Sequence, residues 1–403
     1  MHSRRVLVAA SAMAALALPL AACASSGGSG STAAAAGSAA SGEIKVMAIS
    51  VLQSSALSFP DETAAMQANA EQINAAGGIN GKKLDLIICN DQFDPNVAAD
   101  CARQAASDGV VAVLQPFEPY TQQVDPILQA AGIPMVYGEF ASTTDGTSPI
   151  SFLRDAGVPG GYAAVGIQLA KEGCKKIGAV VVQEVNNLLG ATWIANGAKA
   201  AGAQFIQTPV TQDQADFSAP VAELISQGAD CIVPDTLPQQ GSKVVAAVAQ
   251  SGHVVKMGAI STEFAGPQIA ALGSAANGMI LAGQNYLPTD TSVPAVQAVV
   301  AGMKKYTPSV PLQDSFGIDG WASVTAVEQV LKSVSGPVTA ATVMKAAANA
   351  TYNTGLLATF PAAQSAPVSS FPRAVNWAYL VWTVKDGKAV LNSTKFVPVP
   401  AGL

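Results

Sequence analysis

The sequence holds few of the side chains that catalysis at neutral pH most often uses. Apart from His2, the only histidine is His253, which we expect on the surface or capping a helix C-terminus. No Gly-x-Ser-x-Gly, His-Glu-x-x-His or Cys-x-x-Cys motif occurs, so nothing indicates a serine triad or a zinc site. No Asp-x-Asp-x-Asp loop indicates calcium either. We therefore expect no enzyme, no cofactor and no bound metal.

Four cysteines lie in the part of the chain that we expect to fold. An even number is typical of disulfides in an oxidising compartment, and four cysteines allow three pairings. Cys89 closes an expected strand and Cys101 lies in the next helix, so the two are near in any strand–helix unit. Cys174 just precedes one expected strand and Cys231 begins another. We favour the pairs Cys89–Cys101 and Cys174–Cys231, with buried free thiols as the alternative.

The elements that must position any site alternate regularly between strand and helix. Ile44–Ile49 is an apolar strand, and the next helix begins at Pro60 and ends before Gly77-Gly78. The same pattern predicts strands at 84–89, 110–114, 135–137, 177–182, 204–208, 231–233 and 254–258, and helices at 95–108, 121–131, 160–172, 189–201, 219–227 and 241–250. Continuous apolar strands between amphipathic helices indicate parallel sheets covered on both faces.

The pattern restarts after about residue 157, which predicts an α/β fold with two doubly wound parallel-sheet lobes. Towards the C-terminus we expect helices at 293–305 and 317–333, then a hairpin around Asp386-Gly387. Ligands of such sheets bind outside the carboxyl ends of the strands. The candidate site therefore lies in the loops that follow the strands, at 50–59, 90–94, 115–120, 138–145, 183–188, 235–240 and 259–264. None of these loops contains Arg or Lys.

The N-terminus predicts export from the cell. Basic residues are followed by the apolar run Val6–Leu20, which is shorter than the roughly 20 residues that span a bilayer. The run leads into Leu20-Ala21-Ala22-Cys23, which resembles a bacterial lipobox. We expect a lipoprotein signal peptide over residues 1–22 and a lipid on Cys23. The alternatives are an ordinary signal peptide and a short membrane anchor.

Residues 24–42 are almost wholly Ala, Ser, Gly and Thr, a composition that cannot bury a core. We expect a flexible tether with a reach of roughly 25 Å. Without Arg4 and Arg5, 19 Lys and Arg stand against 27 Asp and Glu, a net charge of −8. This acidic balance argues against nucleic acid as a partner. The 361 residues from 43 onward suffice for two domains.

The segment Ile73–Leu84, with the sequence INAAGGINGKKL, resembles the branched-chain amino-acid type of substrate-binding proteins of ABC transporters. The resemblance continues at Asp94-Pro95, at Asp108–Val113 and at Ala131–Pro134, and resumes at Asp216-Phe217-Ser218. It implies a type 1 periplasmic binding protein with a three-crossover hinge. Lobe 1 would comprise residues 43–157 and 285–367, and lobe 2 residues 158–284 and 368–403.

The resemblance also implies which residues face the ligand. In amino-acid-binding relatives, the loops after the third and fourth strands offer a hydroxyl and backbone N–H groups to the α-carboxylate of the ligand. The corresponding candidates here, together with those of lobe 2, are Gln115, Phe117, Glu118, Tyr120, Glu139, Phe140, Ala141, Asn186, Asn187, Thr236 and Glu263. Glu263 stands where an acidic residue would hold an α-ammonium group.

Glu118 and Glu139 depart from the family pattern, because they place carboxylates of the protein where relatives bind the α-carboxylate of the ligand. Like charges repel in a dehydrated cleft. We expect a neutral polar or cationic ligand with an apolar part, held by Phe117, Tyr120 and Phe140. The alternative is that both glutamates are solvated rim residues and that the aromatic side chains belong to the core.

The resemblance implies a monomer that delivers a small molecule to the permease of an ABC transporter, with lipid as its only membrane contact. The rival hypothesis is a ligand-sensing module of the same fold that acts through a partner protein. Lipobox and tether together favour transport.

Overall fold

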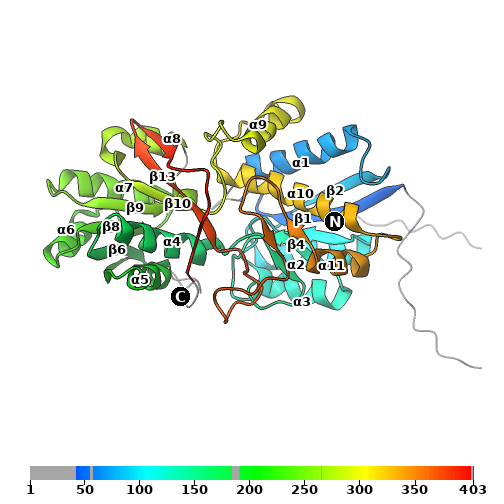
Figure 1. Cartoon of the computed structure of the whole chain (residues 1–403), viewed down its shortest axis with the longest axis horizontal. Helices are drawn as coiled ribbons and strands as arrows, with labels where there is room; N and C mark the ends of the chain where they lie inside the picture. Colours follow the sequence, from blue (N-terminus) through cyan, green and yellow to red (C-terminus); the bar gives the residue numbers. More distant parts are fainter. Residues whose placement is uncertain (1–41, 55–57, 184–189, 265, 401–402) are drawn as a thin grey trace, which may run out of the picture. The chain divides into compact units, whose positions relative to one another are not determined.

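The computed structural model describes residues 42–54, 58–183, 190–264, 266–400 and 403. The expected signal peptide, Cys23 and the tether up to residue 41 lie outside the described residues. Two main β-sheets organise the described part, and helices cover both faces of each (Figure 1). No described helix combines the length and the apolar character that crossing a membrane requires.

The first sheet is parallel and has the strand order β2-β1-β3-β4-β5. Its strands are β1 (Glu43–Ser50), β2 (Lys83–Asn90), β3 (Ala112–Leu114), β4 (Met135–Gly138) and β5 (Ser151–Leu153). Val46 and Ala48 of β1 face one core cluster, whereas Met47 and Ile49 face another. Because side chains alternate along a strand, helices can pack on both faces. Helices α1 (Pro60–Ala75) and α10 (Ser315–Ser333) cover one face, and α2 (Pro95–Asp108) and α3 (Thr121–Ala131) the other.

The second sheet has the order β14-β13-β10-β9-β8-β6-β7. Its parallel part comprises β6 (Lys176–Val182), β7 (Gln204–Val210), β8 (Cys231–Asp235), β9 (Lys256–Ile260) and β10 (Ile280–Gly283). Around it pack α4 (Gly157–Lys171), α5 (Gly190–Ala200), α6 (Ser218–Ser226), α7 (Pro238–Gln250) and α8 (Gly266–Leu272). The predicted fold class, with two doubly wound parallel sheets, is therefore confirmed.

The predicted C-terminal hairpin is also confirmed. Strand β13 (Ala378–Lys385) pairs antiparallel with β14 (Lys388–Leu391), and Lys385 lies opposite Lys388. Asp386 and Gly387 form the two-residue turn with φ of 48° and 70°. Positive φ at both positions matches the twist of a tight hairpin. The short strand β15 (Val397–Pro398) pairs with β13 on another stretch.

The chain passes between the two sheets three times. β5 leads into α4, which packs on β9 and β10. β10 leads into α9 (Pro294–Tyr306), which packs on α1. The chain then forms α10, α11 (Ala340–Ala348), β11 (Thr351–Tyr352) and β12 (Phe360–Pro361), before it returns to the second sheet as β13.

Both favoured cysteine pairs are disulfides in the structure. Cys89 is bonded to Cys101, which joins the end of β2 to α2, and Cys174 is bonded to Cys231, which joins β8 to the segment just before β6. Free thiols at these positions are therefore excluded.

Candidate functional site

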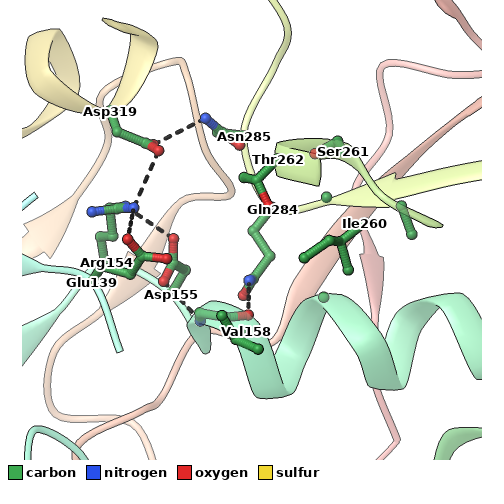
Figure 2. Close-up of a pocket in the computed structure, with 14 residues that line it drawn as sticks. Glu139, Arg154, Asp155, Val158, Ile260, Ser261, Thr262, Gln284, Asn285 and Asp319 are labelled. Carbon is green, nitrogen blue, oxygen red and sulfur yellow. Dashed lines mark hydrogen bonds and ion pairs between the residues drawn. The ribbon is translucent and has the colours of Figure 1, made fainter. Parts of the chain in front are cut away.

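Arg154 lies directly after β5 and is only 2% exposed. Its Nε lies 2.9 Å from Asp155 Oδ2, and its Nη2 lies 3.1 Å from Asp319 Oδ2 and 3.4 Å from Glu139 Oε2 (Figure 2). Its Nη1 donates to the carbonyl of Pro116 at 2.6 Å. These contacts engage all three guanidinium nitrogens, so Arg154 stabilises the protein's own carboxylates.

The buried charges of the described residues are strongly unbalanced. Eleven buried acidic residues stand against one buried cation, Arg154. Burial raises the pKa of Glu139 to about 7, although the Arg154 charge acts in the opposite direction. Burial likewise raises the pKa of Asp319 well above its usual range. At neutral pH part of this cluster therefore keeps its protons, because one guanidinium cannot compensate every neighbouring carboxylate.

Side-chain amides tie the three connections between the sheets together. Gln284 accepts a hydrogen bond from the backbone N–H of Ala156 at 2.7 Å. It also donates one to the carbonyl of Gly157 at 2.7 Å (Figure 2). Asn376, from the third connection, donates to the carbonyl of Arg154 at 2.8 Å. The pocket beside these residues holds about 30 Å³, which is too small for an organic ligand. This region therefore positions the segments around it.

Three half-buried phenylalanine rings meet at the carboxyl end of the first sheet. Phe59 follows β1, Phe117 follows β3 and Phe316 lies in the first turn of α10. The ring centroids of Phe59 and Phe316 are 4.1 Å apart, and Phe117 lies 5.5 and 5.9 Å from these two. The trio presents apolar surface where ligands of such sheets bind. Only Phe117 was among the predicted residues.

In two strand-end loops, backbone N–H groups donate hydrogen bonds to carboxylates of the protein itself. Tyr120 N–H donates to Glu118 Oε1 at 2.6 Å. Ala141 and Ser142 N–H both donate to Asp145 Oδ2, at 3.0 and 2.8 Å. Glu118 and Asp145 are buried, and this burial raises the pKa of each carboxyl well above its usual range. These donors are thus already used within the protein.

The structure places the remaining candidates of the first sheet as follows. Gln115 is buried, and neither atom of its side-chain amide has a hydrogen-bond partner among the described residues. Tyr120 is half-buried, and its hydroxyl donates to the carbonyl of Phe93 at 3.1 Å. Phe140 is fully buried and packs edge-on against Phe371, so its ring belongs to the core.

The candidates of the second sheet form a smaller acidic group. Thr236 Oγ1 donates to Glu263 Oε1 at 3.3 Å, and Glu263 Oε2 has no hydrogen-bond partner among the described residues. Burial and the nearby charge of Asp235 raise the pKa of Glu263 well above its usual range. Asn186 and Asn187 lie outside the described residues.

Besides the ligand contact expected of Phe140, two sequence expectations need correction. The rim interpretation of Glu118 and Glu139 is wrong, because both side chains are buried. The sequence analysis also found no cation in the strand-end loops, yet Arg154 directly follows β5, a strand that the sequence analysis missed. A buried strand of three residues is too short to show a period. The charged pair Arg154-Asp155, directly after the apolar Phe152-Leu153, was the sequence signal that could have indicated a site here.

The chain belongs to the periplasmic binding protein family, whose sequence model matches residues 43–370. It is thus a solute-binding protein of an extracytoplasmic family and not an enzyme. The Leu/Ile/Val-binding protein of Escherichia coli (strain K12) is 26% identical over 325 residues, which cover 76% of this chain and 84% of that protein. The Leu/Ile/Val/Thr-binding protein of Salmonella typhimurium is 25% identical over 333 residues, 78% of this chain and 86% of that protein.

Solved structures share the fold at lower identity. A fatty acid ABC transporter substrate-binding protein from Thermomonospora curvata superposes with a TM-score of 0.72 at 17% identity, covering 89% of this chain and 92% of that one. A solute-binding protein from R. palustris in complex with benzoate gives 0.69 at 18% identity, covering 89% and 98%. At such identities the likeness shows the fold alone.

Proposed function

We propose that this chain is the lipid-anchored binding component of an ABC uptake transporter. It captures a neutral or cationic solute with an apolar part between its two lobes and delivers it to the permease. The lobes comprise residues 43–157 with 285–367, and residues 158–284 with 368–403. The hinge is the region where Gln284 and Asn376 tie the connections together. The lipid on Cys23 and the tether keep the domain near the membrane.

The proposed ligand class rests on one observation. The backbone N–H groups of the strand-end loops already donate hydrogen bonds to the protein's own carboxylates. A ligand carboxylate would have to displace Glu118 from Tyr120 N–H, or Asp145 from Ala141 and Ser142 N–H. It would also enter a protein interior in which eleven buried acidic residues stand against one buried cation, so a further negative charge is unfavourable. A neutral or cationic head group meets neither obstacle.

The residues proposed to hold the solute divide by chemistry. Phe59, Phe117 and Phe316 would pack on its apolar part, since their rings already meet at the strand ends. Glu263, with an unpartnered buried carboxyl oxygen among the described residues, would receive a donor group of the ligand. Closure of the lobes by hinge bending would complete the burial of the solute.

The test is a thermal-shift screen of the secreted chain with Cys23→Ser against amides, polyamines, amino acids, sugars and small aromatic acids. A ligand at 100 times its Kd adds about 2.7 kcal/mol to the free energy of unfolding. We expect the largest shifts from neutral amides or amines with an apolar group. Tight binding of leucine, measured by calorimetry, would overturn the proposed ligand class.

A matched pair of variants then locates the site. Phe316→Ala should weaken binding of the solute at least tenfold, because one wall of the apolar surface is lost. Phe396→Ala is the control, since this half-buried ring packs against Tyr286 on another part of the molecule. Equal affinity of the two variants for the solute would show that the phenylalanine trio does not contact it.

A further inference from the structure

A second, much larger cavity lies beside the N-terminus of α10. It holds about 660 Å³, which is within the range of small-molecule sites. The segment after β9, helix α8, the β13–β14 turn and the segment after β10 form its walls together with the start of α10. Most of the wall is apolar and comes from Phe264, Pro267, Ile269, Ala270, Leu287 and Pro288.

Two serines with buried hydroxyl groups line this cavity, and Ser261 also lines the pocket of about 30 Å³ beside Gln284. Ser261 is 3% exposed and Ser315 is 1% exposed. Neither Oγ has a hydrogen-bond partner among the described residues. Gly283 leaves room for Ser261, because a Cβ at position 283 would lie 1.9 Å from its Oγ. Since buried hydroxyls in native proteins are normally paired, these two indicate a hydrogen-bonding group that enters from the cavity.

The carboxylates beside the cavity already accept hydrogen bonds from the backbone. Asp314 uses its Oδ1 to accept the N–H of Phe316 at 2.9 Å and so caps its own helix. Asp61 accepts the backbone N–H groups of Gln313 and Asp314. Lys388 is the cation among the lining residues, and its side chain is exposed. A charged ligand would lose its hydration against the apolar walls.

We propose that this cavity binds a neutral small molecule with an apolar body and a single hydrogen-bonding head group. The head group contacts Ser261 and Ser315, and the body packs against Phe264 and Leu287. The site is separate from the phenylalanine trio, because Ser315 borders the cavity whereas the neighbouring Phe316 packs on Phe59 and Phe117. The protein thus has a second ligand site beyond the captured solute.

The probe is hexanamide, titrated calorimetrically into the full secreted chain with Cys23→Ser. We expect saturable binding that is tighter than that of hexanoate or hexylammonium. Ala270 is exposed on α8 and lines the cavity, so Ala270→Trp fills it without disturbing the core. This variant should lower the affinity for hexanamide at least tenfold. Absence of saturable binding, tighter binding of either charged analogue, or unchanged affinity of Ala270→Trp would overturn the proposal.

Removal of the hydroxyls gives a second, independent readout. The double variant Ser261→Ala, Ser315→Ala should bind hexanamide at least fivefold more weakly, yet the ligand-free protein should unfold at the same or a higher temperature. This combination is expected only where the hydroxyls lack partners in the empty protein. Ser323→Ala is the control, because Ser323 Oγ already donates to the carbonyl of Asp319 at 2.9 Å. Its affinity for hexanamide should equal that of the unmodified protein. Unchanged affinity of the double variant for hexanamide would show that the head group does not contact Ser261 and Ser315.

The two sites can be told apart with the same variants. Phe316→Ala should leave intact the hexanamide binding that Ala270→Trp abolishes, and Ala270→Trp should leave capture of the transported solute intact. Loss of hexanamide binding in Phe316→Ala would place the probe at the phenylalanine trio. That result would overturn the second site and leave the proposed transport function standing.

Discussion

Glu139 shares the guanidinium of Arg154 with Asp155 and Asp319, and this crowding makes stability depend on pH. Burial raises the pKa of Glu139 to about 7 in the folded protein, against about 4.3 for a free glutamate. The folded state therefore binds more protons than the unfolded state between these values. The stabilisation is fully present below about pH 4.3 and is lost as the pH rises through about 7. We expect Glu139→Gln to remove much of this loss.

The measurement is urea unfolding of both proteins at pH 5, 6.5 and 8. At pH 8 Glu139→Gln should be more stable than the unmodified protein by about 1–3 kcal/mol, and the difference should shrink towards pH 5. Asp100→Asn serves as the control, because Asp100 forms an exposed pair with Arg103 and should change stability by less than about 1 kcal/mol at every pH. Parallel pH curves for Glu139→Gln and the unmodified protein would show that Glu139 does not keep its proton.

At the scale of elements, α4 and α5 approach closely because glycines face the partner backbone. A Cβ at Gly197 of α5 would lie 2.1 Å from the carbonyl oxygen of Ala163 in α4. Gly197→Val must therefore push the helices apart, and overpacking of this kind costs about 1–3 kcal/mol or more. Ala200→Val, at the exposed end of α5, should cost less than about 1 kcal/mol. Chemical denaturation of both variants checks this, and equal costs would contradict the close packing.

The elements also show what sequence reasoning can and cannot predict. The helix predicted at 95–108 matches α2 to the residue. In the structure Asp94 caps its N-terminus and Gly109 ends it in the left-handed conformation. These signals are local in the chain. Strand β5 has no cap or glycine signal of this kind, so the sequence analysis missed both the strand and Arg154, which follows it. Asp319 meets Arg154 from a distant helix, so only the tertiary fold reveals the pair.

The same limit applies to the candidate site. Phe117 could be predicted because it follows the expected strand at 110–114, in a loop that the family resemblance assigns to the ligand. Phe59 lies in a strand-end loop that was named, but nothing in the loop singled out its ring. Phe316 lies at the start of a helix that packs on the first sheet, and its approach to Phe59 depends on how α10 packs against α1.

For the whole molecule, the two disulfides differ in the length of chain that they constrain. Cys174 and Cys231 are 57 residues apart, and Cys89 and Cys101 are 12 apart. The loop-entropy relation predicts a stabilisation of about 4 kcal/mol for the longer loop and about 3 kcal/mol for the shorter one. Replacing each pair by alanines and measuring unfolding in urea tests this order. A larger loss from the shorter loop would mean that native packing, and not chain entropy, decides the effect.

The return of the chain to the second sheet as β13 has a consequence for synthesis. Strand β10 pairs with β9 on one side and with β13 on the other, and 94 residues separate β10 from β13. Because a ribosome delivers the chain from its N-terminus, β10 presents an open edge until β13 has been made. An open strand edge invites pairing with other chains. The nascent chain is therefore most exposed to wrong pairing between the synthesis of β10 and that of β13.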